Sequence, residues 1–106
     1  MTAIDGADVA RLLAGPAPVV VIHAGGPGAF REAHIPGSVA FASFPDAVRM
    51  LRPDDRIVVY GTRRACPRAQ DLAVRLRHAL SSTVWWYVGG LDDWRSAGRQ
   101  IEGRSV

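Results

Sequence analysis

The chain has 106 residues, of which 48% are hydrophobic and 22% are charged, as is typical of one soluble globular domain. No apolar run approaches the roughly 18 residues that a membrane-spanning helix needs, and acidic residues near the start argue against a secretory signal. The net charge of +3 comes from basic residues interspersed with acidic ones, unlike the one-sided basic stripe of a nucleic-acid-binding protein. We therefore expect a single domain over residues 1–106 with neither nucleic acid nor membrane as a partner. The single cysteine cannot form an internal disulfide, which favours the reducing cytoplasm as its location.

The first predicted elements are a helix and a buried strand. Asp5 is a good helix-capping residue, apolar residues follow it at helical spacing, and Gly15-Pro16 is a stop signal. The β-branched run over residues 18–22 shows no alternation of polar and apolar positions, which suits a central parallel strand covered on both faces. After a loop rich in glycine, residues 29–33 are expected to form a short helical turn.

The middle of the chain continues this alternation of strands and helices. Residues 34–37 predict a turn, and residues 38–41 predict a short strand. A helix is expected over residues 44–51, with a proline at a favourable first-turn position. Residues 56–60 contain the apolar run Ile57-Val58-Val59-Tyr60, which predicts another buried strand.

The last third begins with the clearest helical pattern, which starts after Cys66 and has leucine and alanine at helical spacing. Residues 83–88 predict a strand, and Gly89-Gly90 predicts a sharp turn into a helix over residues 91–97. Residues 99–106 are expected to be a polar tail. Alternating strands and helices predict an α/β fold with a mainly parallel sheet and helices on both faces.

Three segments then resemble, in order and spacing, the rhodanese-like domains of the sulfurtransferase family. Residues 34–38 (HIPGS) resemble the "GHIPGA" block, residues 58–60 (VVY) the active-site strand, and residues 89–98 (GGLDDWRSAG) the closing "GGfxxWxxaG" block. The resemblance covers about residues 5–102 and implies a five-stranded, mostly parallel sheet. It also implies sulfur chemistry: a loop cysteine takes sulfane sulfur from a donor such as thiosulfate, holds it as a persulfide and passes it to a thiophilic acceptor.

The sequence departs from this family at the position that matters most. The family's cysteine directly follows the strand, where this chain has Gly61, which cannot carry sulfur. A "D-x-R" pair of the family is His23 and Gly25 here, and the glycine before the turn histidine is Ala33. Cys66 instead matches a second cysteine, five residues on, that some relatives carry. Gly61 also has a purely conformational interpretation, as a residue that permits a positive φ where the strand turns.

The resemblance places the candidate active-site loop between this strand and the next helix, at Gly61, Thr62, Arg63, Arg64, Ala65 and Cys66. Cys66 is the candidate catalytic residue, because a thiol at a helix N-terminus beside arginines favours the thiolate. The alternative is a small apolar residue packed under the loop. We expect a persulfide on Cys66 to point elsewhere than the Gly61 position. Arg63, Arg64 and Arg68 are candidate anion-binding residues or, alternatively, solvated surface arginines.

Other chemistries are less well supported by the sequence. A cysteine phosphatase needs arginine six residues after its nucleophile, and that position is Leu72 counted from Cys66. His23 is a candidate pocket-lining residue, and the resemblance makes His34 a structural turn histidine. No third ligand at a sensible spacing accompanies these histidines, so no metal site and no cofactor are expected.

These observations leave three hypotheses. The first is a rhodanese-like module that lacks normal thiosulfate sulfurtransferase activity and acts as an anion- or protein-binding, regulatory module. The second is an active sulfurtransferase that carries a persulfide on Cys66. The third is an interaction module whose loop has no ligand. The candidate partners are a small sulfur-containing or other anion and a protein.

Overall fold

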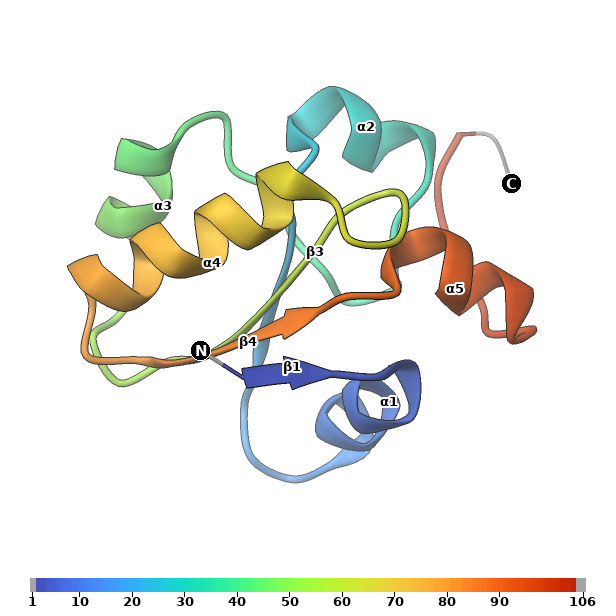
Figure 1. The fold of residues 1–106 in the computed structure, drawn as a ribbon, viewed down its shortest axis with the longest axis horizontal. Helices are drawn as coiled ribbons and strands as arrows, with labels where there is room; N and C mark the ends of the chain where they lie inside the picture. The colour runs from blue at the N-terminus through green and yellow to red at the C-terminus, as the bar shows by residue number, and fades with distance from the viewer. Residues whose placement is uncertain (1, 105–106) are drawn as a thin grey trace.

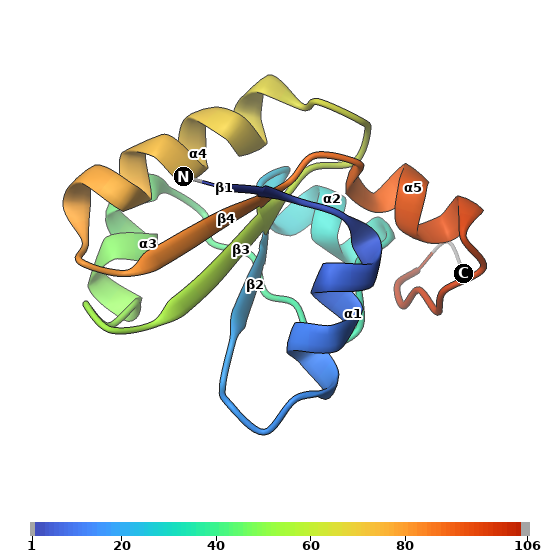
Figure 2. The same ribbon diagram turned by 60° about the horizontal axis from the view of Figure 1, so that its bottom comes forward.

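The computed structural model describes residues 2–104 as a parallel four-stranded sheet with five helices (Figures 1 and 2). The strands are β1 (Thr2–Ile4), β2 (Val20–His23), β3 (Arg56–Tyr60) and β4 (Thr83–Tyr87). The helices are α1 (Gly6–Ala14), α2 (Gly26–Glu32), α3 (Phe44–Met50), α4 (Pro67–Ala79) and α5 (Gly90–Ser96). The sheet order is β1-β4-β3-β2, and every neighbouring pair is parallel. None of the helices in residues 2–104 is long and apolar enough to cross a membrane.

The sheet separates two hydrophobic cores, as the alternation along β3 illustrates. Ile57 and Val59 pack with residues of α3 and α4 on one face. Val58 and Tyr60 pack with residues of α1 and α5 on the other face. All four side chains are fully buried. The predicted α/β class, with helices on both faces of a parallel sheet, is confirmed, and the uninterrupted apolar run of β3 is explained by its coverage on both sides.

The predicted five-stranded sheet differs from the structure, which has four strands within residues 2–104. The expected strand over residues 38–41 is reduced to one parallel bridge, in which the Val39 N–H donates to Val21 O and the His23 N–H donates to Val39 O, both at 2.8 Å. The segment touches the edge of β2 and leaves it again. The fourth strand of the sheet is β1, which the sequence analysis did not predict.

The C-terminal segment also differs from the predicted polar tail. Ile101 is buried in the core beneath α5, and the backbones of Glu102 and His34 form a two-way antiparallel bridge. His34 donates its Nδ1–H to Phe30 O at 2.7 Å, which confirms its structural role in the turn. Residues 105 and 106 of the predicted tail lie outside the described residues.

The buried hydroxyl of Tyr60 connects β3 to the turn that follows α2. The Ile35 N–H donates to Tyr60 Oη at 3.1 Å, and Tyr60 Oη lies 2.8 Å from Ser38 Oγ. Ser38 Oγ donates to Ile35 O at 2.6 Å, so the Tyr60 hydroxyl donates to Ser38. Burial raises the pKa of Tyr60 to about 12, which keeps this donor protonated.

Replacement of Tyr60 by phenylalanine should therefore destabilise the domain. The change removes the hydroxyl and leaves the buried Ile35 N–H without its acceptor, which costs about 1–3 kcal/mol. Urea unfolding followed by circular dichroism measures the loss. The surface substitution Val74→Ala on α4 serves as a control, with an expected change within about 0.5 kcal/mol. A Tyr60→Phe variant as stable as the parent protein would contradict this role of the hydroxyl.

Candidate functional site

The candidate site lies at the carboxyl ends of β2 and β3, which are neighbours in the sheet. After β2 the chain continues into α2, and after β3 it continues through residues 61–66 into α4 (Figure 1). In open parallel sheets, ligands bind outside the carboxyl ends of the strands. Residues 24–26 and residues 61–66 follow these two strand ends, and the Ala24 N–H donates to Tyr60 O at 2.7 Å.

The loop over residues 61–66 is held by the turn that begins α5. Gly61 O accepts the N–H of Leu91, and Thr62 O accepts the N–H of Asp92, both at 2.9 Å. Gly90 lies between the two backbone segments with a φ of +72°, and a Cβ there would meet Gly61 O at 2.7 Å. Only glycine tolerates both the positive φ and this close approach. The predicted sharp Gly-Gly turn thus sets the position of the loop.

Helix α5 is itself fixed to the sheet by polar and aromatic contacts. Tyr87 Oη, at the end of β4, donates to Asp93 Oδ2 at 2.5 Å. Burial, followed by the hydrogen bond to Asp93, raises the pKa of the Tyr87 phenol. The Trp94 ring packs edge-on against Tyr87, and its Nε1–H donates to Gln100 O at 2.8 Å. The loop is therefore anchored to a rigid neighbour.

The side chain of Cys66 lies over Gly61. A Cβ added to Gly61 would meet both Cβ and Sγ of Cys66 at 2.5 Å and Cβ of Ala69 at 3.6 Å. Cys66 is half-buried and packs against the core beneath α4. The Cys66 thiol thus lies beside the Gly61 position, whereas a persulfide on Cys66 was expected to point elsewhere. The two residues share one space, so a side chain at position 61 requires Cys66 to move.

The rest of the loop presents unused backbone donors and cationic side chains. Among residues 62–66, only the N–H of Ala65 donates to a backbone carbonyl within residues 2–104. The acceptor is Val88 O, at 2.8 Å. Ala65 has a φ of +55°, an unusual left-handed conformation for alanine that reverses the chain before α4. Arg63, Arg64 and Arg68 are exposed and form no ion pair with the described residues.

His23 ends β2 and is only 1% exposed. Its Nδ1 accepts the Gly25 N–H at 2.9 Å, so the neutral ring carries its proton on Nε2, for which no hydrogen-bond partner exists within residues 2–104. Burial lowers the pKa of His23 to about 4, and the nearby His34 contributes to the shift. His23 is therefore a neutral group at the border of the site.

A cleft of about 250 Å³ adjoins the loop on the side of α3 and α4. It is lined by His23 and by Arg68. Arg75 and Phe44 also line it, and the sequence analysis did not single them out. Cys66 is absent from its lining. The cleft thus includes one of the three candidate anion-binding arginines, Arg68, and no residue of the loop over residues 61–66.

No group of three histidine, cysteine, aspartate or glutamate side chains within residues 2–104 is placed to hold a metal ion. His34 and His23 are each engaged in contacts with other protein groups. His34 Nδ1 is bonded to a backbone carbonyl, and His23 is buried against Tyr60 with ring centroids 4.8 Å apart. The candidate binding groups of the loop are therefore its backbone amides, its arginines and one thiol.

A comparison with protein-family models matches residues 6–97 to the rhodanese-like domain. The chain belongs to this family. The match extends from α1 through α5 and so includes the loop after β3 and the Gly-Gly turn that holds it. The predicted resemblance is confirmed at the level of the family. Among curated protein sequences, none matched significantly.

Solved structures with the same fold include a rhodanese-like domain and a thiosulfate sulfurtransferase. The BH2092 protein from Bacillus halodurans is 23% identical, with a TM-score of 0.86 over 98% of this chain and 78% of that one. The rhodanese-like domain of the Alr3790 protein from Anabaena sp. is 24% identical, with a TM-score of 0.83 over 99% of this chain and 81% of that domain. A thiosulfate sulfurtransferase from Pseudomonas aeruginosa is 22% identical, with a TM-score of 0.82 over 97% of this chain and 20% of that protein. These likenesses establish the fold.

Substitution of Gly61 by alanine should disturb this rhodanese-like loop, because the new Cβ would overlap Cys66. We expect a loss of about 1–3 kcal/mol in the free energy of unfolding and faster alkylation of the displaced thiol. The matched control is Gly28→Ala, since a Cβ at Gly28 meets nothing within 4 Å. The cost of Gly61→Ala should shrink when Cys66 is also changed to glycine. An equal cost in both backgrounds would contradict the shared space.

The buried His23 predicts a specific dependence of stability on pH. Below about pH 6.5 the unfolded chain binds a proton at His23, whereas the folded protein resists protonation down to about pH 4. The free energy of unfolding should therefore fall as pH decreases through this window, by up to roughly 3 kcal/mol. Urea titrations at several pH values, compared with a His23→Asn variant, isolate this contribution. If the free energy of unfolding changed with pH in the same way in both proteins, His23 would not be the cause.

Proposed function

We propose that this rhodanese-like domain is an anion-binding module whose loop over residues 61–66 holds a small anion, and that it lacks normal thiosulfate sulfurtransferase activity. The proposal rests on what occupies the space above Gly61. That position has no side chain, and the neighbouring Cys66 fills the space while it packs against the core. The role would be binding or regulation, with a small anion or a protein that presents one as partner.

The loop has the donors that an anion requires. The backbone N–H groups of Thr62, Arg63, Arg64 and Cys66 donate to no backbone carbonyl within residues 2–104. Successive N–H groups around a left-handed residue form a concave anion-binding nest, and Ala65 supplies that conformation here. The arginine side chains add positive charge at the same place, which strengthens hydrogen bonds to an anion.

The proposed loss of normal activity is supported by the resemblance together with the position of Cys66. The family's nucleophile stands at the position of Gly61, which offers no sulfur. The Cys66 thiol is half-buried, packs with the apolar residues of α4 and makes no side-chain hydrogen bond to the helix N-terminus. A thiol in such surroundings is a poorer nucleophile than an exposed one beside cations.

One observation favours the second candidate, an active sulfurtransferase that uses Cys66. Its Sγ lies 2.5 Å from the position that a Cβ of residue 61 would take, so the sulfur enters the space of the missing side chain. In this scheme the Cys66 thiolate attacks the outer sulfur of thiosulfate and forms a persulfide, and sulfite leaves with the electron pair of the broken S–S bond. Cyanide then removes the outer sulfur as thiocyanate and restores the thiolate.

Sulfur transfer from thiosulfate to cyanide distinguishes the two candidates. The binding module should give no turnover above that of a Cys66→Ser variant, because neither Gly61 nor the half-buried thiol carries sulfur efficiently. Thiocyanate formation is the readout. Turnover that disappears in Cys66→Ser would overturn the inactive module and support the persulfide on Cys66.

Anion binding is measured separately by titration with sulfate, followed through the amide NMR signals of the loop. The double variant Arg63→Ala/Arg64→Ala should weaken binding by about tenfold or more, since it removes two charges at the loop. The matched control is Arg52→Ala/Arg77→Ala, which removes two exposed charges from the opposite end of the sheet and α4. Equal losses in the two double variants, or loop signals indifferent to sulfate, would contradict an anion site at the loop.

A further inference from the structure

The cleft between α3 and α4 has features of a second ligand site, separate from the loop. Its volume is about 250 Å³, and its floor is formed by Ile22 and Ala24 at the end of β2. One wall is α4, and the other is the segment over residues 41–44 together with the start of α3. None of residues 61–66 lines it. A mixed apolar and polar cleft of this size suits a small organic molecule.

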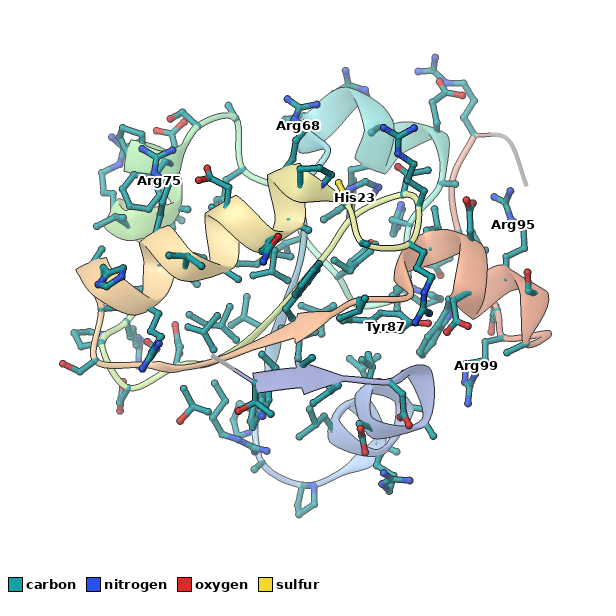
Figure 3. The ribbon with its side chains drawn as sticks, viewed as in Figure 1. His23, Arg68, Arg75, Tyr87, Arg95 and Arg99 are labelled. Atoms are coloured by element: carbon teal, nitrogen blue, oxygen red, sulfur yellow. The ribbon has the colours of Figure 1, made fainter. Side chains whose placement is uncertain are left out.

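The polar groups of the cleft are dominated by two arginines on one face of α4. Arg68 and Arg75 are seven residues apart and therefore lie two turns apart along the same side of the helix. Figure 3 shows Arg75 beside α3 and Arg68 near the start of α4. Asp71 lies between them and pairs with Arg75 at 3.9 Å. With two positive charges and one negative charge in the lining, the cleft favours an anion.

Arg75 is held in place by more than the exposed ion pair. Its guanidinium carbon lies 4.2 Å from the centroid of the Phe44 ring, at the first turn of α3. Stacking on an aromatic ring restricts a long side chain while leaving its N–H groups free to bind a ligand. Arg68 has no ion-pair partner within residues 2–104.

The remaining walls are apolar. Phe41, Phe44 and Leu72 are half-buried, so each side chain offers part of its surface to the cleft. Inorganic anions gain nothing from such walls, whereas a molecule with a hydrocarbon body gains roughly 25 cal/mol for each Å² of apolar surface that it buries. His23 also lines the cleft, and its buried Nε2–H donates to no acceptor within residues 2–104.

We propose that this cleft binds a small organic anion, in which a sulfonate or carboxylate head contacts Arg75, an apolar body packs on Phe41, Phe44 and Leu72, and Arg68 adds positive charge further along the same side of α4. The proposal goes beyond the anion-binding loop and does not depend on it. Arg75 and the aromatic walls belong to the cleft alone, whereas Arg63 and Arg64 belong to the loop alone. The two sites are therefore separable by substitution.

The test is a titration of the full chain with benzenesulfonate, followed by amide NMR, with inorganic sulfate and benzyl alcohol as partial probes. Benzenesulfonate should shift signals of the cleft and bind at least about tenfold more tightly there than either partial probe, because only it uses both the cations and the apolar walls. Equal binding of sulfate in the cleft would overturn the proposal, as would signals that move only in the loop.

Two variants test the contact with Arg75. Arg75→Gln should weaken benzenesulfonate binding by about tenfold, since it removes one charged donor. Asp71→Asn should tighten binding by a few fold, because it releases Arg75 from its partner, and this opposite sign keeps the test valid if Arg75→Gln unfolds.

The control Arg77→Gln makes the same change at an exposed position of α4 outside the cleft and should leave affinity unchanged. Arg63→Ala/Arg64→Ala should likewise spare the cleft while it weakens sulfate binding at the loop. Loss of benzenesulfonate binding in this loop variant would place the anion at the loop and contradict the proposed binding site in the cleft. An Asp71→Asn variant that binds no more tightly than the parent would contradict the assigned head-group contact.

Discussion

The close approach of two glycine positions, Gly61 and Gly90, is the constraint on which the candidate site depends. The loop after β3 reaches the turn before α5 because a left-handed residue without a side chain stands between the two backbones. Hydrogen bonds from the N–H groups of Leu91 and Asp92 then hold the first two carbonyls of the loop. The first two carbonyls of the loop face α5, most of the loop's N–H groups donate to no backbone carbonyl within residues 2–104, and Cys66 lies over Gly61.

This arrangement changes how the missing cysteine is understood. From the resemblance alone, Gly61 is a position that has lost a nucleophile. In the structure it is also a position that could not regain one without displacing Cys66, since the two side chains would overlap. The glycine and the cysteine are coupled by packing, and the proposed binding of an anion by the loop does not require either of them to react.

Much of the fold was predictable because local signals agree with the tertiary structure. The uninterrupted apolar run of β3 indicated a strand covered on both sides, and Asp5 caps α1 through a reciprocal capping box with Asp8. The sheet edges were not predictable in the same way. β1 has three residues and no sequence pattern of its own, and Val39 pairs with β2 at one position only. Such short pairings are decided by the neighbouring strand rather than by local propensity.

For the site, the sequence indicated the loop but neither the direction of the Cys66 side chain nor the cleft. The loop that carries the thiol is held by α5, a contact between segments some thirty residues apart in the chain. The stacking of Arg75 on Phe44 likewise joins two helices that no motif connects. Contacts of this kind arise from packing between segments that are distant in the sequence. The spacing of residues along the chain does not predict them.

The central claim, that Cys66 fills the space above Gly61 and leaves the loop as an anion-binding nest, is tested most directly by one crystal structure of the reduced protein grown in thiosulfate. The account predicts the Cys66 sulfur in contact with the Gly61 backbone, without added sulfur, and an intact thiosulfate within hydrogen-bond distance of the Thr62, Arg63 and Arg64 amides. A persulfide on Cys66, or loop amides directed away from the centre of the loop, would contradict it.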